Sequence, residues 1–85
     1  MNVDSITEVT YKFIYFEKRI NLRKRTQRWL CKNNKSRETL GSIKWFPSWK
    51  QYCYFPYELG IYSYDCLEDI ADFLKKLNGG TYNAR

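Results

Sequence analysis

One stretch of thirteen residues constrains the fold of this chain more than any other. It runs from Trp45 to Tyr57 as WFPSWKQYCYFPY, in which eight residues are Trp, Phe, Tyr or Cys, and it contains the only two prolines of the protein. Aromatic rings are large apolar surfaces that fill a small core or form a binding face, depending on the side to which they point. Any fold of this chain must therefore give these rings a partner.

The length of 85 residues corresponds to one domain, near the lower size limit for a single hydrophobic core. The high aromatic content compensates for this small size, because each ring of the three Trp, five Phe and eight Tyr can bury a large area. We expect a single domain over residues 1–85, with residues 81–85 as a frayed tail. No apolar run approaches the roughly 20 residues that span a membrane, and the first residues are not typical of a signal peptide. These features predict a cytoplasmic protein.

The clearest predicted element is a helix that begins near residue 65. Asp65 and Glu68 have the spacing of a capping box, and Ser63 is an alternative cap. Acids crowd the first turns and lysines the last, as the helix dipole favours, and Asn78 with two glycines ends the helix. The apolar stripe needs a sheet face to cover, and it consists of Leu67, Ile70, Leu74 and Leu77, widened by Cys66 and Phe73.

Three strands are predicted before this helix, over residues 26–32, 39–45 and 51–55, with a polar hairpin tip at residues 33–37. Pro47 separates the second strand from the third, because proline cannot donate to a central ladder. The fold class is therefore α+β, a three-stranded antiparallel sheet packed by a C-terminal helix. We expect the sheet to present to the helix Trp29, Cys31, Ile43, Trp45, Cys53 and Phe55.

Residues 5–20 allow two interpretations. Ser5 and Glu8 fit a capping box, and apolar residues follow at helical spacing, which favours a helix. Residues 9–16, however, are built almost entirely from strand-forming residues, which predicts an edge strand instead. The helix is preferred, because the period and the cap agree.

Catalysis and cofactor binding are not expected. The chain has no histidine, the commonest general base and metal ligand, and no glycine-rich loop that would hold a phosphate. Its three cysteines are widely spaced, so neither a disulfide framework nor a zinc site is predicted. The acids at the start of the predicted helix form a candidate metal cluster, but a solvated helix face explains them better.

Positive charge is concentrated in the first half of the chain. Residues 1–40 carry ten Lys or Arg against four acids, whereas residues 41–85 carry five of each. This asymmetry favours a polyanionic partner such as nucleic acid or a nucleoprotein complex, and the alternative is a solvated surface. Basic side chains attract phosphates and exposed rings stack on bases. The predicted partner-binding residues are Arg23, Lys24, Arg25, Arg28, Lys32, Lys35, Arg37, Lys44, Tyr52 and Tyr54. Alternatively, Tyr52 and Tyr54 lie under the N-terminal segment.

Two DNA- or RNA-binding folds share the predicted order of elements. If residues 5–20 are helical, the order is similar to that of double-stranded RNA-binding domains, although the final helix begins with acids where that family has basic residues. If they are not, three strands and a helix resemble the arm-binding domains of phage integrases, which read DNA through the sheet.

A third resemblance is to a sequence pattern over residues 27–77. The segments Arg28-Trp29, LGSIKW at 40–45, WKQYC at 49–53, Phe55-Pro56 and CLEDI at 66–70 look like those of short proteins from phages and mobile elements. The resemblance implies a phage-type origin and assigns no activity. It raises a second hypothesis, an inhibitor of the anti-CRISPR type that binds a host defence protein.

Overall fold

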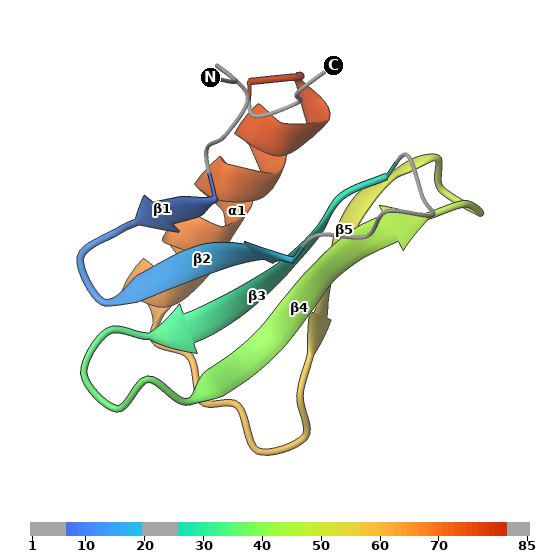
Figure 1. Cartoon of the computed structure of the whole chain (residues 1–85). Coiled ribbons are helices and arrows are strands. Elements are labelled where there is room, and N and C mark those ends of the chain that lie inside the picture. The colour runs from blue at the N-terminus through green and yellow to red at the C-terminus, as the bar shows by residue number, and fades with distance from the viewer. Residues whose placement is uncertain (1–6, 20–25, 82–85) are drawn as a thin grey trace.

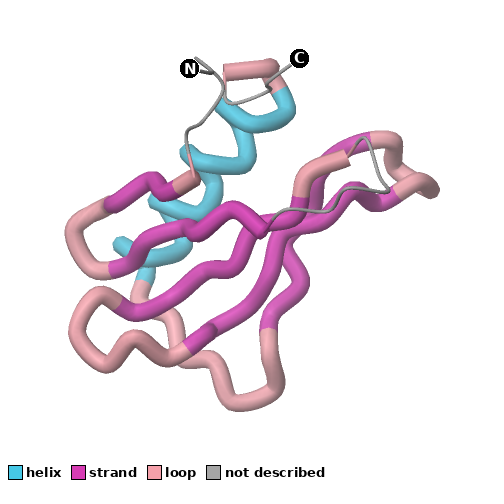
Figure 2. Tube along the Cα trace, in the orientation of Figure 1, coloured by secondary structure: helices cyan, strands magenta, loops and turns pink. Residues whose placement is uncertain are grey.

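The computed structural model describes residues 7–19 and 26–81, which form a sheet and one helix (Figures 1 and 2). The strands are β1 (Glu8–Thr10), β2 (Ile14–Arg19), β3 (Arg28–Asn33), β4 (Thr39–Phe46) and β5 (Gln51–Pro56), and the helix is α1 (Tyr64–Asn78). All neighbouring strands are antiparallel, in the order β1-β2-β3-β4-β5. Figure 1 shows α1 packed across one face of this meander. The α+β class is confirmed, but the sheet has five strands where three were predicted.

The helix preferred for the N-terminal segment is wrong. Within its described part, residues 7–19, the chain forms the β1–β2 hairpin, with Val9 opposite Phe16. Alternation explains this outcome, because Ile14 and Phe16 enter the core while Tyr15 between them points to the other side. Pairing of β2 along the whole of β3 also gives the backbone of β3 a partner strand, which a helix could not provide. The helix-first order shared with double-stranded RNA-binding domains is absent from the described residues.

Two hairpin turns connect the central and final strands. The tip at residues 33–37 is confirmed, since the Asn33 side chain accepts hydrogen bonds from the amides of Lys35 and Ser36 at 2.8 and 3.0 Å. The β4–β5 turn brings the amides of Trp49 and Lys50 to the carbonyl of Phe46 at 3.1 and 2.9 Å. Asn and Ser side chains commonly stabilise such turns by bonding to nearby amides.

The core lies between the sheet and α1. Phe16 and Phe73 are stacked at 4.1 Å between ring centroids, and Trp29 meets Phe73 edge-on at 4.9 Å. The indole N–H of the fully buried Trp29 donates to the side-chain oxygen of Gln27 at 2.8 Å, so the polar group of this ring is satisfied. The buried cluster also contains Ile14, Cys31, Leu40, Ile43, Cys66, Ile70 and Leu77.

Both ends of α1 are fixed by side chains or glycine. The N-cap is Ser63, the alternative cap, and not Asp65; its side chain accepts a hydrogen bond from the amide of Cys66, while Gly79 forms the C-cap. The last helical residue, Asn78, also bonds to both backbone groups of Tyr52, at 2.7 and 3.1 Å, and thus occupies part of the outer edge of β5. Leu67 does not belong to the buried stripe, since its exposed fraction is 52%.

Candidate functional site

The strand register assigns every side chain to one of two faces. Residues directly opposite one another share a face, and successive residues alternate. Trp29, Ile43 and Tyr54 lie opposite one another and face α1. Their neighbours lie on the other side of the sheet, which we call the open face. It carries Glu8, Thr10, Tyr15, Glu17, Arg19, Arg28, Leu30, Lys32, Ser42, Lys44, Phe46, Gln51, Cys53 and Phe55.

The predicted assignment of β5 is inverted. Tyr52 and Tyr54 pack against the core on the α1 side, whereas Cys53 and Phe55 lie on the open face. The cause is the turn, which pairs Phe46 with Gln51 and thereby places Tyr54 opposite Ile43. The alternative, in which the two tyrosines lie under the N-terminal segment, is also wrong, because β1 and β2 extend the sheet sideways.

The two tyrosines have structural partners that account for their positions. The Tyr54 hydroxyl is 2.7 Å from the hydroxyl of Tyr62, which in turn donates to the carbonyl of Leu40. Burial raises the pKa of Tyr54, so its hydroxyl stays protonated and available as a donor. The Tyr52 hydroxyl accepts from the amide of Gln27 at 3.0 Å. Neither ring is placed to stack on a ligand at the open face.

Trp45 also differs from its predicted role. It lies on the α1 side, as expected, but 37% of its surface is exposed. Its ring meets Tyr52 edge-on at 5.2 Å at the end of the sheet. The fully buried tryptophan of the core is therefore Trp29 and not Trp45.

The central feature of the open face is a line of three cations on neighbouring strands. Arg19 of β2 is directly opposite Arg28 of β3, and Arg28 is directly opposite Lys44 of β4. All three side chains are exposed. We call this line the cation row. Like charges directly opposite one another destabilise a sheet, so the two opposed pairs lower the stability of the free protein.

An aromatic strip lies beside the cation row. It consists of Phe55, Phe46 and Trp49, with centroids 6.1 Å apart for Phe46 and Phe55 and 5.1 Å apart for Phe46 and Trp49. The amino group of Lys44 lies over the Phe55 ring, 4.5 Å from its centroid, and joins the strip to the row. Trp49, at the hairpin tip, is 67% exposed.

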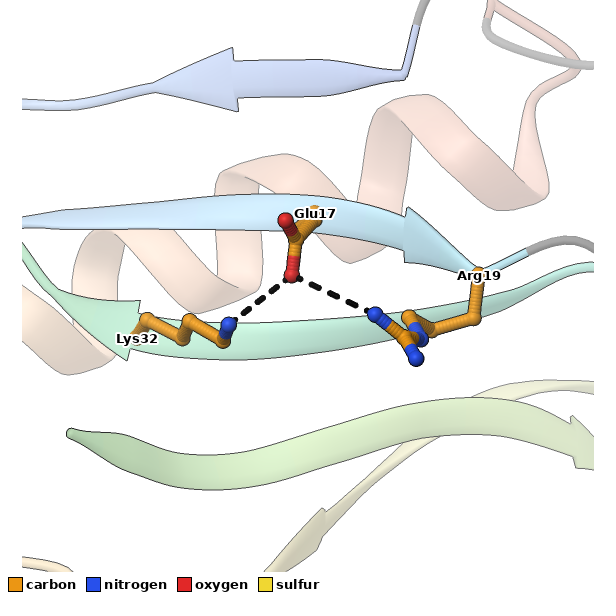
Figure 3. Close-up of polar contacts among 3 residues, drawn as sticks. All are labelled: Glu17, Arg19 and Lys32. Atoms are coloured by element: carbon orange, nitrogen blue, oxygen red, sulfur yellow. Dashed lines mark ion pairs between the residues drawn. The ribbon is translucent and has the colours of Figure 1, made fainter. Parts of the chain in front are cut away.

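Glu17 partly neutralises the other end of the open face. Its carboxylate contacts the Lys32 amino group at 2.9 Å and lies 3.8 Å from the Arg19 guanidinium (Figure 3). The hydrogen bond from Lys32 holds the pKa of Glu17 below its usual range. Glu17 is therefore ionised at neutral pH, and Lys32 contributes less free charge to this face than Arg28 or Lys44.

The other predicted basic residues lie at one end of the sheet or outside the described residues. Lys35 and Arg37 are exposed in the β3–β4 turn, where the Arg37 guanidinium covers the buried Tyr15 ring at 4.8 Å. Arg23, Lys24 and Arg25 lie outside the described residues. Sequence reasoning missed Arg19, Phe46, Trp49 and Phe55 as surface candidates. Arg19 was hidden by the helical interpretation of residues 5–20.

Other kinds of site find little support in the residues that the structure describes. Within residues 7–19 and 26–81 there is no group of three or more Cys, Asp or Glu arranged to hold a metal ion. Cys31, Cys53 and Cys66 are free thiols, and burial raises the pKa of Cys31 to about 11. No helix in the same ranges is long and apolar enough to cross a membrane.

No family model, curated protein or solved structure matches this chain. Its function is therefore inferred from its own residues.

Proposed function

We propose that this protein binds nucleic acid, alone or within a nucleoprotein complex, through the open face of its sheet. It acts by occupying its target and not by chemistry. The observation that carries the proposal is the cation row, in which Arg19, Arg28 and Lys44 face one another across three strands.

The charge arrangement favours a polyanion. Opposed like charges destabilise the free protein, and phosphates placed over the row would remove that cost. A phosphate backbone provides regularly spaced negative charges, and its neutralisation releases condensed counterions. In the complex, attraction between the cations and the phosphates would thus offset the repulsion among the cations.

The opposite layer of the molecule carries a group of four acids. Asp65, Glu68, Asp69 and Asp72 all lie on α1, which packs on the other side of the sheet. A polyanion is attracted to one side of such a molecule and repelled by the other. The two layers would therefore orient the protein, with the open face toward the nucleic acid.

The test removes two charges from one layer or the other. Arg28→Ala with Lys44→Ala should weaken binding to an oligonucleotide and lower the slope of log affinity against log salt by about 1.4–1.8, if both residues contact phosphates. The control, Lys75→Ala with Lys76→Ala, makes the same change in net charge on α1 and should alter both quantities much less. Equal effects of the two pairs, or no binding of DNA or RNA at low salt, would show that the proposal is wrong.

A second candidate function is inhibition of a host defence protein, in the manner of an anti-CRISPR protein. The observation in its favour is an apolar segment between β5 and the first turns of α1. Leu59 and Ile61 are 89% and 85% exposed, and Tyr64 is 72% exposed. Exposed apolar patches often mark protein interfaces. A host protein that co-purifies after nuclease treatment, and is lost with Leu59→Ser and Ile61→Ser, would support this function, whereas capture that requires nucleic acid would argue against it.

A further inference from the structure

We propose that the preferred ligand of the open face is single-stranded, with bases stacked on the aromatic strip and phosphates on the cation row. This inference rests on the proposed nucleic-acid function and adds the class of ligand. The strip is again Phe55, Phe46 and Trp49.

The strip is not part of the core. The core cluster and the partly buried residues packed against it include none of its three rings. Phe46 and Phe55 lie on the face away from α1, and they are half-buried against their neighbours. Contact with the helix therefore does not explain the aromatic content of the strip, as it does for the core rings Phe16 and Trp29.

The most exposed ring of the strip, Trp49, is carried by a hydrogen-bonded turn. The amide of Trp49 donates to the carbonyl of Phe46 at 3.1 Å, and the amide of Lys50 donates to the same carbonyl at 2.9 Å. Lys50 adopts a left-handed conformation, with φ at 53°, which closes the turn. A ring carried by a hydrogen-bonded turn binds at a lower entropic cost than one on a flexible loop.

The position of the strip relative to the charges matches one strand of nucleic acid. Lys44 belongs to the cation row and also covers the Phe55 ring at 4.5 Å, so phosphate-binding and base-binding groups are adjacent. Proteins that bind single strands combine a basic groove with rings on which successive bases stack. In a duplex the base faces are stacked on one another, so only the phosphates remain for this surface.

The experiment compares single strands with duplexes for the parent protein and two tryptophan variants. The probes are fluorescently labelled 12-mers of DNA and of RNA, each single-stranded and as a duplex of the same sequence, with binding measured by anisotropy. The parent should bind single strands at least about tenfold more tightly than duplexes. Trp49→Ala should weaken single-strand binding roughly 5- to 150-fold, with an unchanged salt slope. The control is Trp45→Ala, which removes the same ring type from the α1 side and should change binding far less.

The outcomes separate this inference from the proposed function. Equal affinity for single strands and duplexes, or no effect of Trp49→Ala on single strands, overturns the single-strand inference. Nucleic-acid binding still stands in that case if Arg28→Ala with Lys44→Ala lowers the salt slope. A preference for DNA or for RNA supports the inference in either case and identifies the ligand further. Thermal melts of both variants confirm that the proteins compared are folded.

Discussion

The two faces of one sheet in this protein follow opposite rules. On the α1 side, Trp29 is fully buried, edge-on to Phe73, and its N–H has a partner in Gln27. On the open face, Arg28 lies directly between two other cations. Because successive residues of a strand alternate between the faces, the consecutive residues Arg28 and Trp29 of β3 lie in these two different environments. Stability and the proposed binding can therefore be altered almost independently.

The difference between the faces also concerns polar groups. The buried hydroxyl of Tyr54 is bonded to that of Tyr62. On the open face, the Glu17 carboxylate lies 2.9 Å from the Lys32 amino group but 3.8 Å from the Arg19 guanidinium. A satisfied network specifies a fold, whereas opposed like charges favour the approach of an anion.

The largest expected effect is on the α1 side. Trp29→Ala should reduce the free energy of unfolding by about 3–5 kcal/mol, because it leaves a cavity between the sheet and the helix. Urea unfolding followed by circular dichroism measures this loss, and Trp29→Phe provides a milder variant if the alanine protein does not fold. Trp49→Ala, at the exposed hairpin tip, should change stability by less than about 0.5 kcal/mol. A similar loss for both variants would remove the distinction between the faces.

Gly41→Ala should have an intermediate effect. A methyl group there would collide with the hydroxyl end of the Tyr54 ring and with the carbonyl oxygen of Phe55. Overpacking of this kind costs about 1–3 kcal/mol. In a double-mutant cycle with Tyr54→Phe, the double variant should lose less unfolding free energy than the two single variants lose in sum. The reason is that removal of the hydroxyl relieves part of the collision. Additive losses would show that the Tyr54 hydroxyl is not the obstacle.

On the open face, Glu17→Gln should increase the affinity for nucleic acid. The change removes the carboxylate that pairs with Lys32 and Arg19 and raises the net charge by one. Affinity for a labelled oligonucleotide should therefore rise roughly 1.5- to fivefold. Glu68→Gln makes the same change in net charge on α1 and should have a smaller effect. If Glu17→Gln weakens binding, the open face is not the site of phosphate contact.

The smallest effect concerns acid stability on the α1 side. The Tyr11 hydroxyl donates to Asp72 at 2.8 Å, and this bond together with Lys76 holds the pKa of Asp72 below its usual value of 3.8. A carboxylate with a lowered pKa in the folded state stabilises the protein above its unfolded pKa, and the contribution is lost as the pH falls through the folded value. Melting temperatures from pH 5 to pH 2 should therefore fall more for the parent than for Asp72→Asn. Parallel curves would exclude this contribution of Asp72.

Several elements are determined by short-range sequence signals. The helix follows from an apolar period, a capping residue and two terminal glycines, and the observed α1 ends where Asn78 and Gly79 predict. The tip at residues 33–37 follows from Asn33, whose side chain bonds locally to the turn. The alternation of β3 correctly separates Trp29 and Cys31 from Arg28 and Lys32. In each case the deciding interactions lie within a few residues of chain.

The tertiary structure alone decided which rings of the aromatic stretch face the helix. The β4–β5 turn sets the register, and a shift by one residue exchanges the two faces of a strand, so Tyr54 entered the core and Phe55 did not. The N-terminal segment became a hairpin because β3 offered it an edge, and that pairing is invisible to local periodicity. The cation row has the same origin. Arg19, Arg28 and Lys44 are far apart in the sequence, and only the register of three strands places them side by side.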